Sequence, residues 1–78
     1  MIRKAAIVSI SGLILTKQEI IIIKKERPWG IILFKRNILS EIQLTNLIKN
    51  IKRIMKDKKY PILIDEEGGK VSRLSNFL

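Results

Sequence analysis

The residues with the clearest capacity for chemistry lie near the end of the chain, in the segment YPILIDEEGGKVSRL at positions 60–74. A short apolar run ends there in three consecutive carboxylates, at positions 65–67, and the pair Gly68 and Gly69 follows at once. The pattern predicts a buried strand that carries a carboxylate at its carboxyl end and then turns sharply. In open α/β sheets and α/β barrels, ligands bind at this end of the strands.

Asp65 is the first candidate for a binding group. Adjacent residues of an extended chain point to opposite sides, so the three carboxylates cannot all share one pocket. A solvated acidic loop is the competing interpretation. The glycine pair favours a ligand site, because glycine permits a tight turn and a close approach of the backbone. A phosphate cradle is disfavoured, since the glycines lack the spacing of phosphate-binding loops and three acids precede them.

Three further polar residues are candidates for the same edge of the sheet. Arg73 could return over the strand end and donate two hydrogen bonds to vicinal hydroxyls or a carboxylate, although a surface arginine is the simpler interpretation of this residue alone. Arg36 and Asn37 follow the preceding apolar run, so a parallel neighbouring strand would bring them to this edge as pocket support. Loop capping and turn formation is the alternative for both.

Three apolar runs of strand length lie at residues 5–10, 31–34 and 62–64. Runs that are apolar throughout are typical of strands buried on both faces, in a parallel sheet covered by helices. The expected order is β-α-β-α-β with right-handed crossovers. The sequence therefore predicts an α/β fold with a parallel sheet.

Two helices are expected between these strands. Thr16 and Glu19 have the spacing of a capping box and indicate a helix that stops at Pro28, although four consecutive isoleucines at residues 20–23 favour a strand by propensity. A second helix is predicted after Ser40, because leucine, isoleucine and methionine recur there at helical spacing and lysines crowd its end.

Composition narrows the classes of function. The 78 residues make at most one small domain, or part of a larger one. The chain has no cysteine and no histidine, which removes thiolate metal sites and the commonest general base, and no metal or cofactor is expected. The net charge is +9. Lysines are scattered and aromatic residues for base stacking are scarce, so nucleic acid is not the expected partner, although a small basic nucleic-acid-binding protein remains an alternative.

The first residues look somewhat like a signal peptide, with two cations before an apolar stretch. A small-x-small cleavage pattern is missing at the right place, and the same stretch suits a buried strand. No run approaches the roughly 18 apolar residues of a membrane span. We therefore expect a cytoplasmic protein without a membrane partner.

Two motifs resemble the N-terminal part of family 3 glycoside hydrolases, PWGIILFKRNI at residues 28–38 and PILIDEEGGKVSRL at residues 61–74. The match is to the bacterial β-N-acetylhexosaminidases of cell-wall recycling and covers nearly the whole chain. It implies that residues 1–78 are a partial N-terminal domain, the first strands of a (β/α)8 TIM-type barrel. It also implies a retaining enzyme that removes terminal β-linked N-acetylglucosamine from muropeptides.

The resemblance assigns roles to four residues. It implies that Asp65 binds sugar hydroxyls, that Arg73 contacts the same sugar, and that Gly68 and Gly69 form the loop. The family's nucleophile and its acid/base lie far downstream, so no catalytic residue is expected here and the chain is expected to be inactive alone. Three parallel strands cannot close into a barrel, so they would also leave open edges and an uncovered inner face. Half of a split glycosidase, completed by a complementary C-terminal barrel fragment, is the alternative.

The sequence departs mildly from the family's pattern at three positions. Lys70 stands where the family often has arginine, while Glu66 and Ser72 stand where glutamine is frequent. None of the three is expected to touch the sugar.

Overall fold

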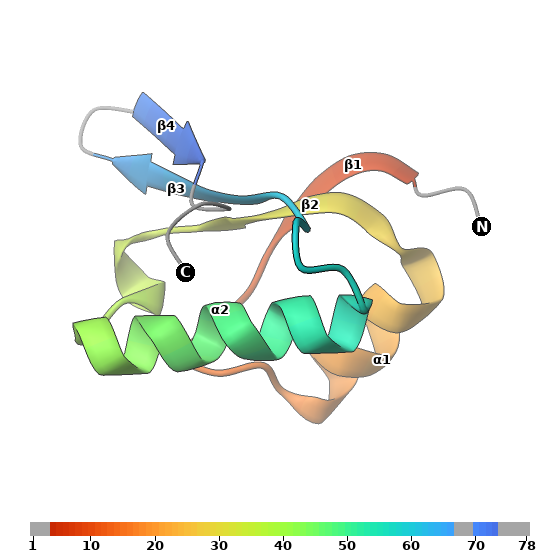
Figure 1. Cartoon of the computed structure of the whole chain (residues 1–78), viewed down its shortest axis with the longest axis horizontal. Helices are drawn as coiled ribbons and strands as arrows, with labels where there is room; N and C mark the ends of the chain where they lie inside the picture. The colour runs from red at the N-terminus through yellow and green to blue at the C-terminus, as the bar shows by residue number, and fades with distance from the viewer. Residues whose placement is uncertain (1–3, 67–69, 74–78) are drawn as a thin grey trace.

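A computed structural model describes residues 4–66 and 70–73 of the chain. Figure 1 shows a twisted sheet above a layer of two helices. The elements follow in the order β1 (Lys4–Ser9), α1 (Lys17–Glu26), β2 (Pro28–Leu33), the 3₁₀ turn η1 (Lys35–Asn37), α2 (Glu41–Met55), β3 (Ile62–Glu66) and β4 (Lys70–Arg73).

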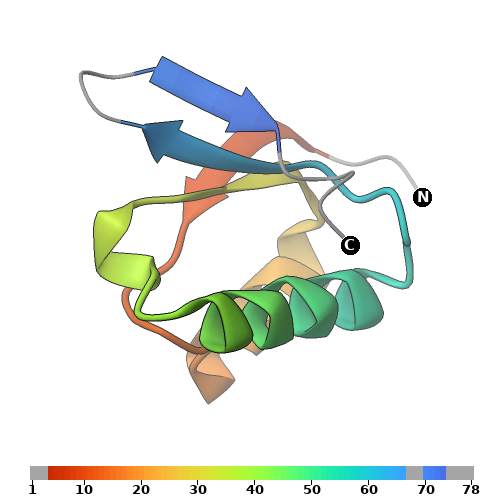
Figure 2. The same cartoon turned by 60° about the vertical axis from the view of Figure 1, so that its left-hand side comes forward.

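The strands β1, β2 and β3 are parallel neighbours in chain order, with Val8 beside Ile31 and Ile31 beside Ile62. Both helices cover the same face of the sheet and pack side by side (Figures 1 and 2). A doubly wound sheet would place helices on both faces, whereas an α/β barrel keeps every helix on the outside. The predicted α/β fold with a parallel sheet is confirmed, and its arrangement is that of a barrel segment.

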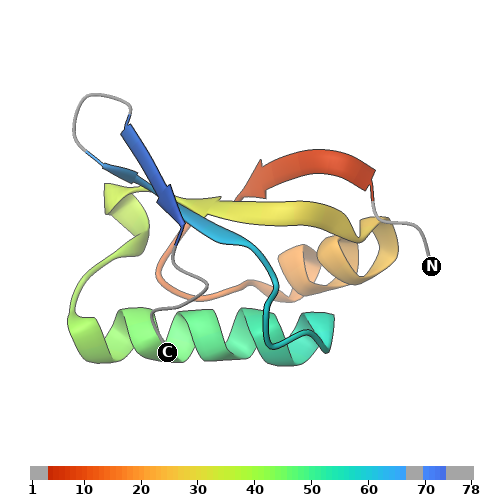
Figure 3. The same ribbon diagram turned by 45° about the horizontal axis from the view of Figure 1, so that its top comes forward.

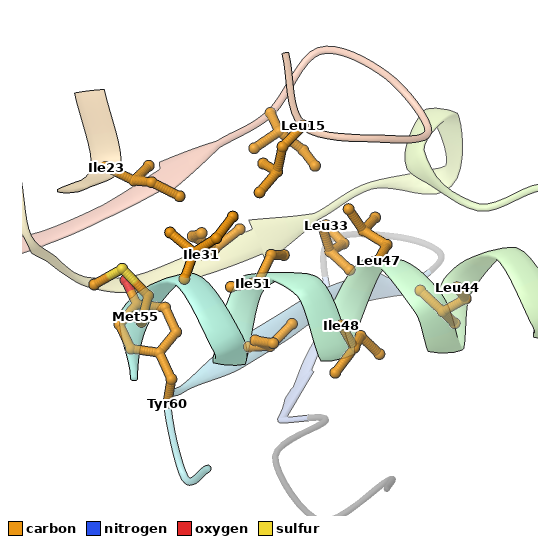
Figure 4. Packing of buried hydrophobic residues seen from close by; sticks show 13 residues of the cluster. Leu15, Ile23, Ile31, Leu33, Leu44, Leu47, Ile48, Ile51, Met55 and Tyr60 are labelled. Atoms are coloured by element: carbon orange, nitrogen blue, oxygen red, sulfur yellow. The ribbon is translucent and has the colours of Figure 1, made fainter. Parts of the chain in front are cut away.

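The core lies between α2 and the sheet (Figure 4). The apolar spacing predicted for this helix is confirmed, because its buried residues recur three and four positions apart. They pack against Ile31, Leu33 and Ile62, none of which exposes any surface. The buried stripe of α2 consists of Leu44, Leu47, Ile48, Ile51, Ile54 and Met55.

Helix α1 forms despite its run of four isoleucines. Its N-cap Thr16 and Glu19 make the complete, reciprocal capping box that their spacing predicts. Ile23 is buried against the sheet, while Ile21 and Ile22 stay more than half exposed. The cap and one buried contact therefore outweigh the strand propensity of the β-branched residues.

The strand β4 was not expected from the sequence. It runs antiparallel to β3 (Figure 3). The register places Val71 beside Asp65 and Arg73 beside Leu63. The edge of β3 that was predicted to be open is thus paired within the chain. Four residues, three of them polar, are too short a pattern to distinguish such a strand from a loop.

The sheet face opposite the helices is the uncovered inner face expected of three strands that cannot close, but it corrects the expectation drawn from the apolar runs alone. The apolar strands were predicted to be buried on both faces, but Ile7 on this open face is 50% exposed and Ile32 and Leu63 are only partly buried. No described element covers the open face. In a closed barrel this face points to the interior, which side chains of the other strands fill.

Candidate functional site

Asp65 lies at the carboxyl end of β3, on the open face of the sheet. Ile62 points to the helices with no exposed surface, and the alternation of a strand then places Leu63 and Asp65 on the other side. Leu33 pairs with Ile64, so Phe34 comes level with Asp65 on the neighbouring strand. The carboxylate is therefore where the sequence placed it, at the carboxyl edge of a parallel sheet, and it is partly exposed.

The strand β4 brings the backbone of Arg73 back along β3. That backbone pairs with Leu63, which makes Arg73 a diagonal neighbour of Asp65, at a typical separation of about 7–8 Å. The side chain of Arg73 lies outside the described part of the structure, and so do Gly68 and Gly69. The contact of Arg73 with a sugar and the turn formed by the glycines stay predictions.

Asn37 and Arg36 hold the loop between β1 and α1. The Asn37 side chain is fully buried, and its Nδ2 donates to the carbonyl oxygens of Ile10 at 3.1 Å and Gly12 at 2.7 Å. Its Oδ1 accepts a hydrogen bond of 2.8 Å from the amide of Phe34. Arg36 donates to the same Ile10 oxygen through Nη2 at 3.1 Å and Nε at 3.3 Å. Both side chains therefore bind the backbone of a loop, which is the capping role given above as the alternative to pocket support.

The Arg36 guanidinium is held from a second side. Its Cζ lies 4.8 Å from the centroid of the Phe34 ring, within the range of a cation–π contact. Arg36 thus bridges the carboxyl ends of β1 and β2, next to the level of Asp65.

Two more side chains fasten the same loop, and sequence reasoning missed both contacts. Glu19 accepts from the amides of Ser11 and Thr16, each at 2.9 Å, so its capping box also reaches the start of the loop. Gln43 donates to the Leu13 oxygen at 2.8 Å from the first turn of α2. The pattern of the sequence showed Glu19 only as a helix cap, and it gave no sign of a contact across 30 residues.

Glu19, in the first turn of α1, is a titratable group that binds this loop. Partial burial of its carboxylate raises the pKa, whereas the hydrogen bonds from the Thr16 and Ser11 amides lower it. The hydrogen bonds prevail, so the pKa of Glu19 lies below its ordinary value of 4.5. The ionised carboxylate is therefore the form that holds the loop at neutral pH.

Two shallow grooves lie away from Asp65. One, of about 480 Å³, runs between Ile14 of the β1–α1 loop and the outer side of α2. The other, of about 510 Å³, is basic and lies at the end of α2, at the opposite end of the sheet from Asp65. Its lining residues are Lys49, Lys52, Arg53, Lys56, Asp57 and Lys58.

Among residues 4–66 and 70–73, no cluster of acidic, histidine or cysteine side chains could hold a metal ion. Within this described part of the chain, no helix combines the length and the apolar character needed to cross a membrane.

The one-sided helix layer and the carboxylate at the carboxyl edge define a segment of an α/β barrel, of the kind that binds ligands at that edge. No family model matches the chain. It is 43% identical over 67 residues to a β-hexosaminidase of Haemophilus ducreyi, a match that covers 86% of this chain and 19% of the relative. A β-hexosaminidase of Actinobacillus pleuropneumoniae serotype 5b is 39% identical over 59 residues, 76% of this chain and 17% of that protein.

A solved structure shows the same relationship. NagZ from Neisseria gonorrhoeae, in complex with N-trifluoroacetyl-D-glucosamine, matches with a TM-score of 0.73 and 32% identity, over 90% of this chain and 20% of that one. In sequence and in fold, the chain therefore resembles one part of the bacterial β-hexosaminidases, as its two motifs predicted. The chain spans about one fifth of the length of the curated relatives it matches.

Proposed function

We propose that residues 1–78 supply the sugar-holding part of the barrel of a retaining β-N-acetylhexosaminidase that acts on N-acetylglucosamine of muropeptides. One observation carries the proposal: a chain 43% identical to a β-hexosaminidase places the acid of its DEEGG motif at the carboxyl edge of a parallel sheet. Ligands of α/β barrels bind at this edge. The partial N-terminal barrel domain expected from the sequence is part of the same proposal.

Asp65 is the proposed ligand for sugar hydroxyls. An ionised carboxylate is an acceptor for two hydroxyl donors, and hydrogen bonds to a charged group are stronger than neutral ones. The register supports Arg73 as the second sugar ligand, because β4 brings its backbone to the diagonal position beside Asp65. Arg36 and Asn37 support this pocket indirectly, through the loop whose carbonyl oxygens they bind.

Catalysis with retention requires a nucleophile and an acid/base on opposite sides of the scissile bond, about 5 Å apart. Among the described side chains of the open face, Asp65 is the only acid, and the resemblance assigns it to binding. We infer that the catalytic groups come from polypeptide other than residues 1–78. That polypeptide is a continuation of this protein or, in the alternative, a complementary barrel fragment.

The uncovered open face supports this partnership. Ile7, Ile32 and Leu63 leave apolar surface that the remaining strands of a barrel would cover. The chain alone is then expected to be inactive. We also propose that the protein is located in the cytoplasm.

A small basic nucleic-acid-binding protein is the competing function. The basic groove at the end of α2 favours it, with five cations around Asp57. Cations at a helix C-terminus are also favoured by the helix dipole, which explains the groove without a ligand. Duplex DNA titrated at low salt distinguishes the two: salt-dependent binding supports the competing function, and its absence eliminates it.

Sugar binding is tested in a fusion protein in which residues 1–78 replace the matched segment of the Haemophilus ducreyi β-hexosaminidase. The probe is N-trifluoroacetyl-D-glucosamine, the ligand of the similar NagZ structure, followed by its ¹⁹F NMR signal. We expect the fusion protein to bind the probe and D65N to bind it at least about tenfold more weakly, because a hydrogen bond to a charged group is lost.

The matched control is E41Q, the same loss of charge on the exposed first turn of α2. E41Q should bind as the parent does. Binding that is unchanged in D65N, or no binding by a folded parent fusion, would contradict the proposed function.

A further inference from the structure

The loop between β1 and α1 is held at four consecutive residues, Ile10 to Leu13, by side chains from other elements. The Asn37 side-chain amide donates to the backbone oxygens of Ile10 and Gly12. The Glu19 carboxylate accepts from the Ser11 amide, and the Gln43 side-chain amide donates to the Leu13 oxygen. Loops of this kind are usually among the mobile parts of a protein. Here the backbone is fixed from η1, α1 and α2 together.

This loop leaves β1 beside the proposed sugar site. Ser9 pairs with Ile32, and Ile32 with Leu63, so the chain turns off β1 just below the level of Asp65 and two strands away. Two strand spacings of about 4.8 Å separate them by about 10 Å. The strand β2 lies between them, and Phe34 directly follows its last residue. The loop and Asp65 thus lie at the same carboxyl edge of the sheet, on the two strands that flank β2.

Asn37 is the centre of this arrangement. It is the buried polar residue of the described core, and it satisfies one amide and two carbonyl groups at once. Its Oδ1 fixes η1 to the end of β2, while its Nδ2 fixes the loop to η1. A backbone held by a buried, fully used amide has little freedom to shift.

We propose that Asn37 is a positioning residue: its Nδ2 holds the Ile10–Gly12 backbone as the wall of the sugar site opposite Asp65. It touches no substrate and acts through the loop. The proposal rests on the proposed function, since it assigns the loop to the sugar site of that enzyme.

The substitution N37D isolates the donor. It keeps the shape of the side chain and the oxygen that accepts from Phe34, but it turns a carboxylate oxygen toward the two carbonyl oxygens at 3.1 and 2.7 Å. The loop is then repelled where it was held. N46D, the same change on an exposed residue of α2, is the matched control.

The first measurement is amide hydrogen exchange on the 78-residue chain. In N37D we expect faster exchange at Ser11 and its neighbours, with the amides of α2 as slow as in the parent. Should N37D fail to fold, Q43E serves as the second variant, because it removes the donor to the Leu13 oxygen from a partly exposed position. Unchanged exchange in the loop of a folded variant would overturn the proposal.

The second measurement separates positioning from stability in the fusion protein. A variant that merely folds less lowers the apparent kcat, while its folded molecules keep the KM for an aryl N-acetyl-β-glucosaminide. A displaced wall raises KM in the folded molecules, and we expect kcat/KM to fall by about tenfold to a hundredfold, mostly through KM. N46D should keep both constants.

The outcomes distinguish the two proposals. An active parent fusion whose KM is unchanged by N37D and Q43E contradicts the positioning role alone. A folded parent fusion without sugar binding or turnover contradicts the proposed function and removes the positioning role with it.

Discussion

Substitution of Glu19 by glutamine tests how the β1–α1 loop is held. The carboxylate accepts a hydrogen bond of 2.9 Å from each of the backbone amides of Ser11 and Thr16, one on each oxygen. The side-chain amide of glutamine has only one acceptor oxygen. The change also removes a negative charge from the first turn of α1, where the helix dipole favours it.

The expected cost follows from these two losses. A lost capping interaction costs about 0.5–2 kcal/mol, and a charge at an exposed helix start contributes about 0.3–1 kcal/mol. We expect E19Q to lower the free energy of unfolding by about 1–2 kcal/mol, at the low end because the carboxylate is largely solvated. For a domain of this size each kcal/mol shifts Tm by about 4–8 °C.

The assay is thermal unfolding followed by circular dichroism, at several pH values. Because the pKa of Glu19 is lowered in the folded chain, its stabilisation is present above its ordinary pKa of 4.5 and is lost as the pH falls through the lowered value. The gap in Tm between the parent and E19Q should therefore be largest at neutral pH and shrink toward strongly acidic pH.

E41Q provides the control, since Glu41 lies in the first turn of α2 and is exposed. It should shift Tm much less than E19Q. A gap that stays constant with pH, or an equal effect of E41Q, would refute the role given to the Glu19 carboxylate.

Substitutions at two buried residues, Ile51 and Tyr60, test the core. I51A removes a side chain that has no exposed surface between α2 and the sheet, and it should lower the free energy of unfolding by about 2–5 kcal/mol. The control I42A, at a residue that is 76% exposed, should change it by less than about 0.5 kcal/mol. Urea unfolding measures both, and equal effects would contradict the packing. Y60F removes the hydroxyl that donates to the Pro28 oxygen at 2.7 Å and should lower the free energy of unfolding by about 1–3 kcal/mol. The expected readout is a lower urea midpoint with an unchanged slope. An unchanged midpoint would show that this buried hydrogen bond contributes nothing.

The local signals of the sequence predicted most of the fold. The 3.6-residue period gave α2 and its buried stripe, and the capping box gave the start of α1 against its isoleucine run. The strand β4 escaped prediction, because four residues carry too little periodicity and their pairing depends on the free edge of β3. The uncovered inner face was expected from the number of strands, although the apolar runs by themselves indicated strands buried on both faces.

The candidate site was predictable only in part. Asp65 could be placed because an apolar run ends at it, which is a local signal. Asn37 binds backbone oxygens of the β1–α1 loop that lie 27 and 25 positions before it in the chain. The local sequence pattern does not predict these hydrogen bonds. Side-chain contacts to distant backbone depend on the packed fold, and a single sequence does not display them.

The most direct test of the central claim is turnover of an aryl N-acetyl-β-glucosaminide by three proteins, measured side by side: the 78-residue chain, the fusion protein and its D65N variant. If residues 1–78 hold the sugar while other polypeptide supplies the catalytic groups, the chain alone should show no turnover, the fusion protein should be active, and D65N should lose at least about tenfold in kcat/KM. Robust turnover by the chain alone would contradict the claim. So would a fusion protein whose activity is indifferent to Asp65.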